Sequence, residues 1–254
     1  MTMRGAALAL ALITAAGTAH AQSPDVISAD RPGLADSAAL VGKGVWQLEA
    51  GFQWELHDGE DDLFVPALFR LGVSRRIEAR VEGNTLSSRL VGTTRQTGLA
   101  PTSLGGKVGI VLADDDTPGV SVIGRVFPAW GTDEFHSDHV TGDVRLVVDW
   151  ALTDRWSLNP NGGFSWSDDG ESAFATGSFA MTIGYSPRPA LSFFVDTSVQ
   201  QREAAGGTAS TVWDGGVAYI PRQNWQFDIS AGARTRGETA ARAFVAIGFA
   251  YRHK

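Results

Sequence analysis

Charged side chains occupy alternate positions along several stretches of this sequence of 254 residues. Carboxylates and cations that share one face could bind and guide a small solute, or they could pair with one another and fix the fold. If these faces line the interior of the protein, the candidate solute-binding residues are Arg70, Arg80, Lys107, Arg125, Arg145, Glu49, Glu82, Asp143, Asp196 and Asp228. Four further charged residues share the same faces: Glu78, Asp149, Asp214 and Arg234. Eight acids against six bases form a mixed set, which does not predict a filter for one sign of charge.

Residues that could support catalysis are sparse. The stretch 133–139 (DEFHSDH) offers the Asp and His that some barrel proteases carry at their rim, but one loop cannot establish the mutual geometry that catalysis requires. His136 and His139 could instead bind a divalent metal adventitiously. No histidine after position 21 lies in mid-strand beside a serine, as a phospholipase of this architecture would need. We therefore expect no enzyme activity, no metal centre and no cofactor.

Composition excludes further classes of protein. The sequence contains no Cys, which excludes a disulfide scaffold, a thiolate metal site and a Cys nucleophile. Its formal net charge is −7, so we do not expect a nucleic-acid partner.

The first 21 residues have the three parts of an export signal. Arg4 supplies the positive charge, residues 6–16 form the apolar run, and Ala19-His20-Ala21 has the small-x-small form of a cleavage site. A membrane anchor would need about 20 apolar residues, which this run does not reach. We therefore predict a signal peptide over residues 1–21.

The elements that must position the charged residues are strands. In residues 45–56, apolar side chains such as Trp46 and Leu48 alternate with polar ones such as Gln47 and Glu49, which is the period of a half-buried strand. Twelve segments show this alternation: 45–56, 63–73, 77–83, 104–112, 120–128, 140–152, 156–166, 179–185, 191–199, 213–219, 225–230 and 245–252.

Short turns alternate with longer polar loops between these segments. The short turns are 74–76, 113–119, 153–155, 186–189 and 221–224, and the longer loops are 57–62, 85–103, 131–139, 167–171, 201–210 and 235–241. This alternation is typical of an all-β, up-and-down antiparallel transmembrane β-barrel, here of about 12 strands. Aromatic residues near the predicted strand ends support it: Trp46, Trp54, Trp150, Trp156, Trp166, Trp213, Tyr219 and Trp225. The alternative is a soluble β-sandwich, which shares the alternation but rarely has such long strands.

Residues 22–43 show no comparable pattern. They are predicted to form a periplasmic N-terminal segment, or else a segment that folds into the barrel mouth, ahead of a barrel over residues 44–254.

Several motifs resemble the phenol-degradation meta-pathway (MetA-pathway) transporter family. They are ADRPGLADS at 29–37, GVWQLEAG at 44–51, LGGKVG at 104–109, FPAWG at 127–131, the stretch 212–231, and 248–252. The resemblance implies a Gram-negative outer-membrane protein that takes up or exports small, often aromatic, molecules. The chain departs from the usual pattern of outer-membrane barrels by ending Tyr-Arg-His-Lys instead of on Phe. Val245, Ile247, Phe249 and Tyr251 could still signal to the barrel assembly machinery.

A barrel of twelve strands lies between plugged eight-stranded barrels and open 16- to 18-stranded porins, so we expect a narrow polar lumen. The five predicted cations from Arg70 to Arg145 fall on consecutive strands, and Asp196, Asp214 and Asp228 fall on the opposite wall. Such a transverse field would favour solutes with an apolar body and an ionised group, such as aromatic carboxylates. We thus expect a passive channel for small aromatic or hydrophobic molecules in the outer membrane, with lipid and solute as partners; the alternative is a non-conducting structural or interaction barrel.

Overall fold

The computed structural model describes residues 26–114, 117–238 and 240–253. The predicted signal peptide lies outside the described residues. Each strand alternates between side chains that face the interior and side chains that face outward. In the first strand, β1 (Trp46–Leu56), Gln47 and Glu49 are buried, whereas Phe52 and Trp54 are 55% and 53% exposed. This pattern repeats around the molecule and leaves a continuous apolar outer belt, which a membrane barrel requires.

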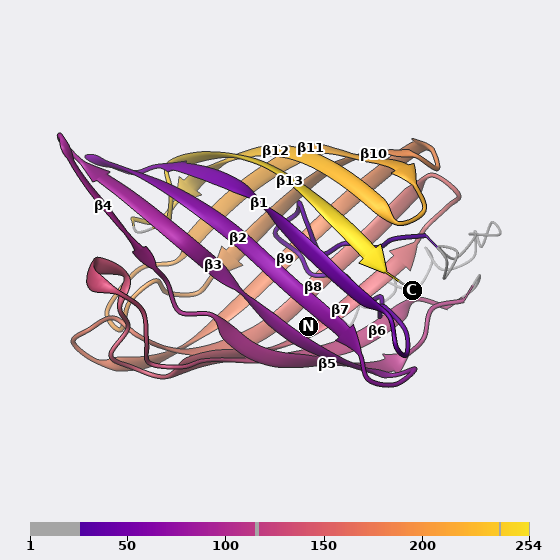
Figure 1. The fold of residues 1–254 in the computed structure, drawn as a ribbon, viewed down its shortest axis with the longest axis horizontal. Coiled ribbons are helices and arrows are strands. Elements are labelled where there is room, and N and C mark those ends of the chain that lie inside the picture. Colours follow the sequence, from indigo (N-terminus) through magenta and orange to yellow (C-terminus); the bar gives the residue numbers. More distant parts are fainter. Residues whose placement is uncertain (1–25, 115–116, 239, 254) are drawn as a thin grey trace, which may run out of the picture.

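Within the described residues, thirteen antiparallel strands form one sheet (Figure 1). They are β1 (Trp46–Leu56), β2 (Glu60–Gly72), β3 (Ile77–Val91), β4 (Thr94–Leu99), β5 (Ser103–Val111), β6 (Gly119–Phe127), β7 (Thr141–Ala151), β8 (Trp156–Asp168), β9 (Ala173–Arg188), β10 (Leu191–Gln200), β11 (Ser210–Arg222), β12 (Trp225–Arg236) and β13 (Ala243–His253). One short 3-10 turn, η1 (Asp133–Phe135), lies in the loop between β6 and β7.

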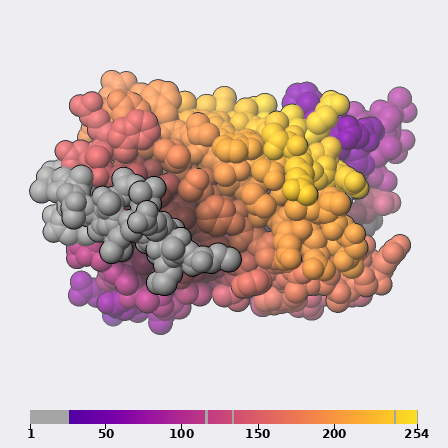
Figure 2. Space-filling view, turned by 180° about the vertical axis from the view of Figure 1, so that it is seen from behind, coloured from indigo at the N-terminus to yellow at the C-terminus, as the bar shows by residue number. Residues whose placement is uncertain are grey.

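Twelve of the strands close the barrel. Strand β1 pairs with β13 over its whole length, from Trp46 opposite His253 to Leu56 opposite Ala243. The pairing of β2 with β3 completes the ring, while β4 pairs with β3 alone. The prediction of a closed barrel of twelve antiparallel strands is confirmed, and Figure 2 shows the outer face that the strands of the C-terminal half build in orange and yellow.

The prediction of a loop over residues 85–103 is wrong in part. Strand β3 continues to Val91 and turns at Gly92, whose φ of 61° is one that glycine adopts readily. Strand β4 then pairs back onto β3, with Leu99 opposite Leu86. Residues 87–97 are mostly polar and lack the apolar alternation of a lipid-facing strand, so they carry no sequence signal for this hairpin. It projects beyond the ring at the loop end (Figure 1).

Aromatic rings gather where the strands reach the short-turn end. The ring of Trp46 lies 5.6 Å from that of Tyr251, and Trp225 lies 4.7 Å from Tyr251, measured between centroids. Trp156 and Tyr185 form a similar pair at 4.7 Å. Amphipathic rings favour the boundary between hydrocarbon and water, so these clusters mark one edge of the membrane-embedded belt.

The described part of the N-terminal segment, residues 26–43, runs inside the barrel (Figure 1). It enters at the short-turn end, where the Ile27 amide donates to the Gln223 carbonyl at 2.7 Å. It returns to the same end, where the Gly44 amide donates to the Gly72 carbonyl at 2.8 Å. Between these points Ala38 packs against Ile123 and Val147 of the wall, in a small buried apolar cluster. We call residues 26–43 the inner segment.

No helix in the described ranges is long and apolar enough to cross a membrane.

Candidate solute path inside the barrel

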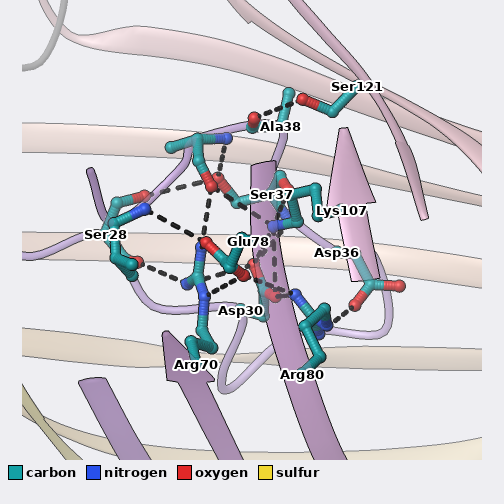
Figure 3. A network of polar contacts seen from close by, with 12 residues as sticks. Ser28, Asp30, Asp36, Ser37, Ala38, Arg70, Glu78, Arg80, Lys107 and Ser121 are labelled. Atoms are coloured by element: carbon teal, nitrogen blue, oxygen red, sulfur yellow. Dashed lines mark hydrogen bonds and ion pairs between the residues drawn. The ribbon is translucent and has the colours of Figure 1, made fainter. Parts of the chain in front are cut away.

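Asp30 of the inner segment is the centre of an ion network with the wall (Figure 3). One carboxylate oxygen accepts a hydrogen bond from Arg80 of β3 at 2.5 Å. The Arg70 guanidinium of β2 lies 3.7 Å away, and the Lys107 ammonium of β5 lies 3.4 Å away. Three cations from three neighbouring strands therefore converge on one carboxylate, which ties the inner segment to this side of the barrel.

Arg70 uses its guanidinium fully within this network. It donates to Glu78 at 2.8 Å, to Glu49 at 3.2 Å, and to the carbonyls of Ser28 and Ala39 at 2.9 and 2.7 Å. The Arg70 side chain and both carboxylates are fully buried. Buried charges are stable only when they are paired and hydrogen-bonded, so these residues hold one another in place.

Asp36 makes a second attachment further along the inner segment. Its carboxylate accepts a hydrogen bond from Arg145 of β7 at 3.1 Å and lies 3.4 Å from Arg80. The Asp36 amide donates to the Asn161 side chain at 2.8 Å, and Asn159 donates back to the Asp36 carbonyl at 3.1 Å. Both the charge and the backbone of Asp36 are thus satisfied by the wall.

The cations fix the protonation state of these two acids. Burial alone would raise the pKa of Asp30, but Arg70, Lys107 and Arg80 hold it well below its usual range. Burial likewise opposes ionisation of Asp36, and Arg145, Arg125 and Arg80 together lower its pKa. Both carboxylates are therefore ionised at neutral pH and keep their attraction to the wall.

The remaining cations of this wall pair with acids of the wall itself. Arg125 forms a bidentate pair with Asp143, at 2.9 and 2.5 Å, and also contacts Glu82. Arg145 lies 3.1 Å from Asp143. The five cations predicted for one arc do lie on the contiguous strands β2, β3, β5, β6 and β7, but each of them is compensated by a carboxylate at close range.

The opposite wall, on β10, β11 and β12, is different. Asp228 receives a hydrogen bond from Arg31 of the inner segment at 3.2 Å. Asp196 accepts from the Leu34 amide at 2.7 Å, and Asp214 accepts from the Gly215 amide at 2.6 Å. Each of these three carboxylates keeps one buried oxygen without a hydrogen-bond partner among the described residues.

Two glycines of the wall make room for Arg31. A Cβ added at Gly51 would lie 2.7 Å from the guanidinium, and one added at Gly248 would also collide with it. Gly51 and Gly248 face each other across β1 and β13. The guanidinium therefore lies against bare backbone, where no larger residue would fit.

A cavity of about 490 Å³ lies on the loop side of the inner segment. Residues 30–34 and Asp36 form its floor. Its wall is polar near Glu49, Gln53 and Arg80, and apolar near Leu68 and Phe244. A space of this size, lined by apolar surface and a few polar groups, can hold a small molecule with an apolar body.

All ten candidate lining residues face the interior, as the alternation predicts; their role in solute binding stays a prediction. Arg234, also on the inner face, lies at the loop end, where it bonds to the carbonyls of Glu238 and Ala240 and to Asp58. Sequence reasoning missed Asp30, Arg31 and Asp36, together with Asn159 and Asn161. One sequence signal could have indicated the residues of the inner segment: the motif ADRPGLADS carries several charges within a stretch that shows no strand alternation.

The His-rich stretch does not assemble a compact site. His136 lies 3.2 Å from Asp138, whose side chain is 84% exposed, and His139 lies 3.6 Å from Asp168. Over the described ranges, no group of three or more His, Cys, Asp or Glu residues is placed to hold a metal ion.

A closed twelve-stranded sheet with an apolar outer belt and a charged interior defines a transmembrane β-barrel of the outer-membrane type. The chain belongs to the family described as "Putative MetA-pathway of phenol degradation", which it matches over residues 29–253. The resemblance seen in the sequence motifs is thereby confirmed. No protein of curated function matches the chain.

Solved structures share this fold. An outer-membrane channel from Pseudomonas putida F1 superposes with a TM-score of 0.65 and 10% identity, covering 87% of this chain and 99% of that one. The NanC porin gives a TM-score of 0.55 at 11% identity, covering 81% and 98%. The KdgM porin, solved in complex with disordered oligogalacturonate, gives 0.52 at 12% identity, covering 80% and 98%. At these identities the likeness concerns the fold.

Proposed function

We propose that this protein is an outer-membrane channel through which small aromatic or hydrophobic molecules diffuse passively along a narrow polar lumen. The observation that carries the proposal is the cavity of about 490 Å³ within the barrel, which combines the apolar side chains of Leu68 and Phe244 with charged groups. The channels and porins that share the fold support it.

Passage through the barrel requires the inner segment to move. The cavity is bounded by residues 30–34 and Asp36, and the inner segment lies between it and the short-turn end. Its ties to the wall are mainly ionic and hydrogen-bonded, as at Asp30, Arg31 and Asp36, and a small apolar cluster surrounds Ala38. A conducting state would exchange these contacts for water.

The same network favours the second candidate, a barrel that conducts nothing. Fully compensated buried ions at Asp30, Arg70 and Arg80 are what a permanently closed interior would contain. Function as a structural or interaction protein would then rest on the loops and the outer surface.

Conductance separates the two candidates. The refolded full-length protein is placed in a planar bilayer and compared with an Asp30→Asn, Asp36→Asn double variant, which weakens two ionic ties of the inner segment and keeps the Arg31–Asp228 pair. We expect single-channel openings in the parent and a higher open fraction in the variant. Liposome swelling with benzyl alcohol then tests passage of an aromatic solute. If neither protein conducts or swells liposomes, the barrel is structural.

We also propose that the protein is not an enzyme, because His136 and His139, the histidines of the candidate catalytic loop, contact different acids and do not form one compact group. We also propose that the barrel assembly machinery recognises β13, whose outward residues Val245, Ile247, Phe249 and Tyr251 form an apolar row on the strand that closes the barrel.

A further inference from the structure

The wall formed by β10, β11 and β12 carries carboxylates that the protein itself does not neutralise. Asp196 and Asp214 are direct cross-strand partners, and they are 2% and 4% exposed. Like charges in this relation repel each other. Across the described residues, no salt bridge links either of them to a cation, whereas Asp228 has Arg31. Asp196 and Asp214 therefore have no cation paired with them among the described residues, unlike the carboxylates of the wall from β2 to β7.

Unused hydrogen-bonding groups converge on the same place. One oxygen of Asp196 and one of Asp214 have no hydrogen-bond partner in the described structure. The Ser230 hydroxyl of β12 is 2% exposed and lies beside the Asp214 carboxylate, to which it can donate a hydrogen bond. Ser230 lies opposite Gly216, two residues from Asp214 on the same face of β11. Buried polar groups usually have hydrogen-bond partners, so the free carboxylate oxygens of Asp196 and Asp214 are available to a donor from a bound molecule.

Two aromatic rings lie beside Asp214. The Phe194 ring lies over Gly216, where an added Cβ would be 2.8 Å from two ring atoms. The Phe244 ring lies over Gly232, the cross-strand partner of Asp214, where an added Cβ would be 2.5 Å from the ring. The two glycines thus let rings lie against the strands on either side of the carboxylate.

Carboxylates beside aromatic faces suit one class of ligand. An ammonium group can donate hydrogen bonds to the carboxylates and the hydroxyl, while its charge is attracted to the faces of the rings. Asp214 and Phe244 both line the cavity of about 490 Å³, which gives a solute access to them. A carboxylate solute would be repelled by Asp214 and Asp196, and the cations of the opposite wall already have partners.

We propose that Asp196, Asp214 and Ser230, together with the rings of Phe194 and Phe244, form a binding site for small organic ammonium ions, above all those with an aromatic body. This inference rests on the proposed channel function, because the cavity supplies the route to the site. It names the solute class of that channel and reverses the preference for aromatic carboxylates that the sequence alone suggests.

Binding is tested by titration calorimetry on the full-length protein in detergent. The probes are benzylammonium, benzoate and benzyl alcohol, which are alike in size and differ in charge. We expect benzylammonium to bind best and Asp214→Asn to weaken its binding by about tenfold, which corresponds to about 1.4 kcal/mol. Phe244→Leu should weaken it by a smaller factor. Asp138→Asn, which removes an exposed loop carboxylate, is the matched control and should bind like the parent.

Ion selectivity gives an independent measurement. Under a KCl gradient across a planar bilayer, the parent should pass K⁺ in preference to Cl⁻, and the preference should fall in the Asp196→Asn, Asp214→Asn double variant. A heat-modifiable band in SDS confirms that each variant has folded; the neutral replacements relieve a like-charge contact, so we expect them to fold.

The outcomes distinguish the two proposals. Absence of any conductance rejects the channel function, while calorimetry still decides the site. Equal binding of benzoate and benzylammonium, or binding that Asp214→Asn leaves unchanged, overturns the ammonium site even in a protein that conducts. Absence of benzylammonium binding also overturns it.

Discussion

The Asp30 carboxylate accepts a 2.5 Å hydrogen bond from Arg80, a residue fifty positions later in the chain. This contact joins the inner segment to β3 of the wall. Arg80 is buried and also contacts Glu78 and Glu82 of its own strand, so the barrel itself holds it in place. The wall therefore presents a preformed cationic surface, and the inner segment supplies the acids that complete it.

We predict that Asp30→Asn loosens the inner segment. Removing one partner of a buried ion pair leaves the other charge uncompensated, at a cost of about 3–5 kcal/mol. Three cations, Arg70, Arg80 and Lys107, lose their shared partner in this variant. Limited proteolysis of the folded protein in detergent should then cleave within residues 26–43 faster than in the parent. Asp138→Asn should cleave at the parental rate, and equal protection in Asp30→Asn would show that ionic ties do not hold the segment.

We predict that the inner segment stays in place as the pH falls from neutral until the medium is more acidic than about pH 4. The pKa of Asp30 lies below its ordinary value of 3.8 when the segment is seated, and that of Asp36 is also lowered. Carboxyls with a lowered pKa stabilise the seated state above their ordinary pKa, and this stabilisation is lost as the pH falls below it.

Cleavage by an acid-stable protease, followed from about pH 7 to about pH 2, measures this release. The onset should lie below the ordinary pKa of Asp. Release that begins between about pH 7 and about pH 5 would point to a different titrating group. The Asp30→Asn, Asp36→Asn variant is the control, because it should have lost this acid-dependent step.

The sequence predicted the barrel well because strand alternation is a local signal. Each outward residue such as Phe52 or Ile229 must be apolar where lipid touches it, and each inward residue such as Glu49 is free to be polar. This rule predicts correctly that the side chains of all ten candidate lining residues point into the barrel. The ring has an even number of strands, because β4 lies outside it, so its first and last strands, β1 and β13, can pair antiparallel.

Contacts between distant segments could not be predicted in the same way. The inner segment has no regular structure, so Asp30 and Asp36 show no period that would assign them to the lumen. The order of the strands that carry their partners, Arg80 and Arg145, is predictable, but the sequence does not indicate which part of the inner segment lies beside each of these cations. The compensation of the cationic wall, and the lack of it beside Asp214, are therefore properties of the folded chain.

We predict that Ile229→Arg blocks assembly of the barrel. The Ile229 side chain is 51% exposed on the outer face, and an Arg at the middle of a membrane barrel costs about 2–4 kcal/mol. The yield of the heat-modifiable band in SDS, after refolding into detergent or lipid, measures assembly. Ser230→Ala, at the next position on the inner face, should assemble like the parent. Equal yields for the two variants would mean that the outer face is not in contact with lipid.

We predict that the β3–β4 hairpin can be shortened without loss of the barrel. Strand β4 pairs with β3 alone, and the ring is closed by the pairing of β2 with β3. The variant replaces residues 88–97 with a two-residue turn and keeps Leu86 and Leu99. It also keeps the hydrogen bond that the Leu99 amide donates to the Thr132 hydroxyl at 2.7 Å. Loop-end residues outside the ring contribute little to closure, so the heat-modifiable band should form with parental yield and the thermal midpoint should be close to that of the parent. A matched deletion within β5, which pairs with both β3 and β6, should abolish the band, because it opens the ring. If shortening the hairpin is as damaging as cutting β5, then β4 supports the wall through its contacts with residues 132–135, and the barrel depends on this loop as well as on its twelve strands.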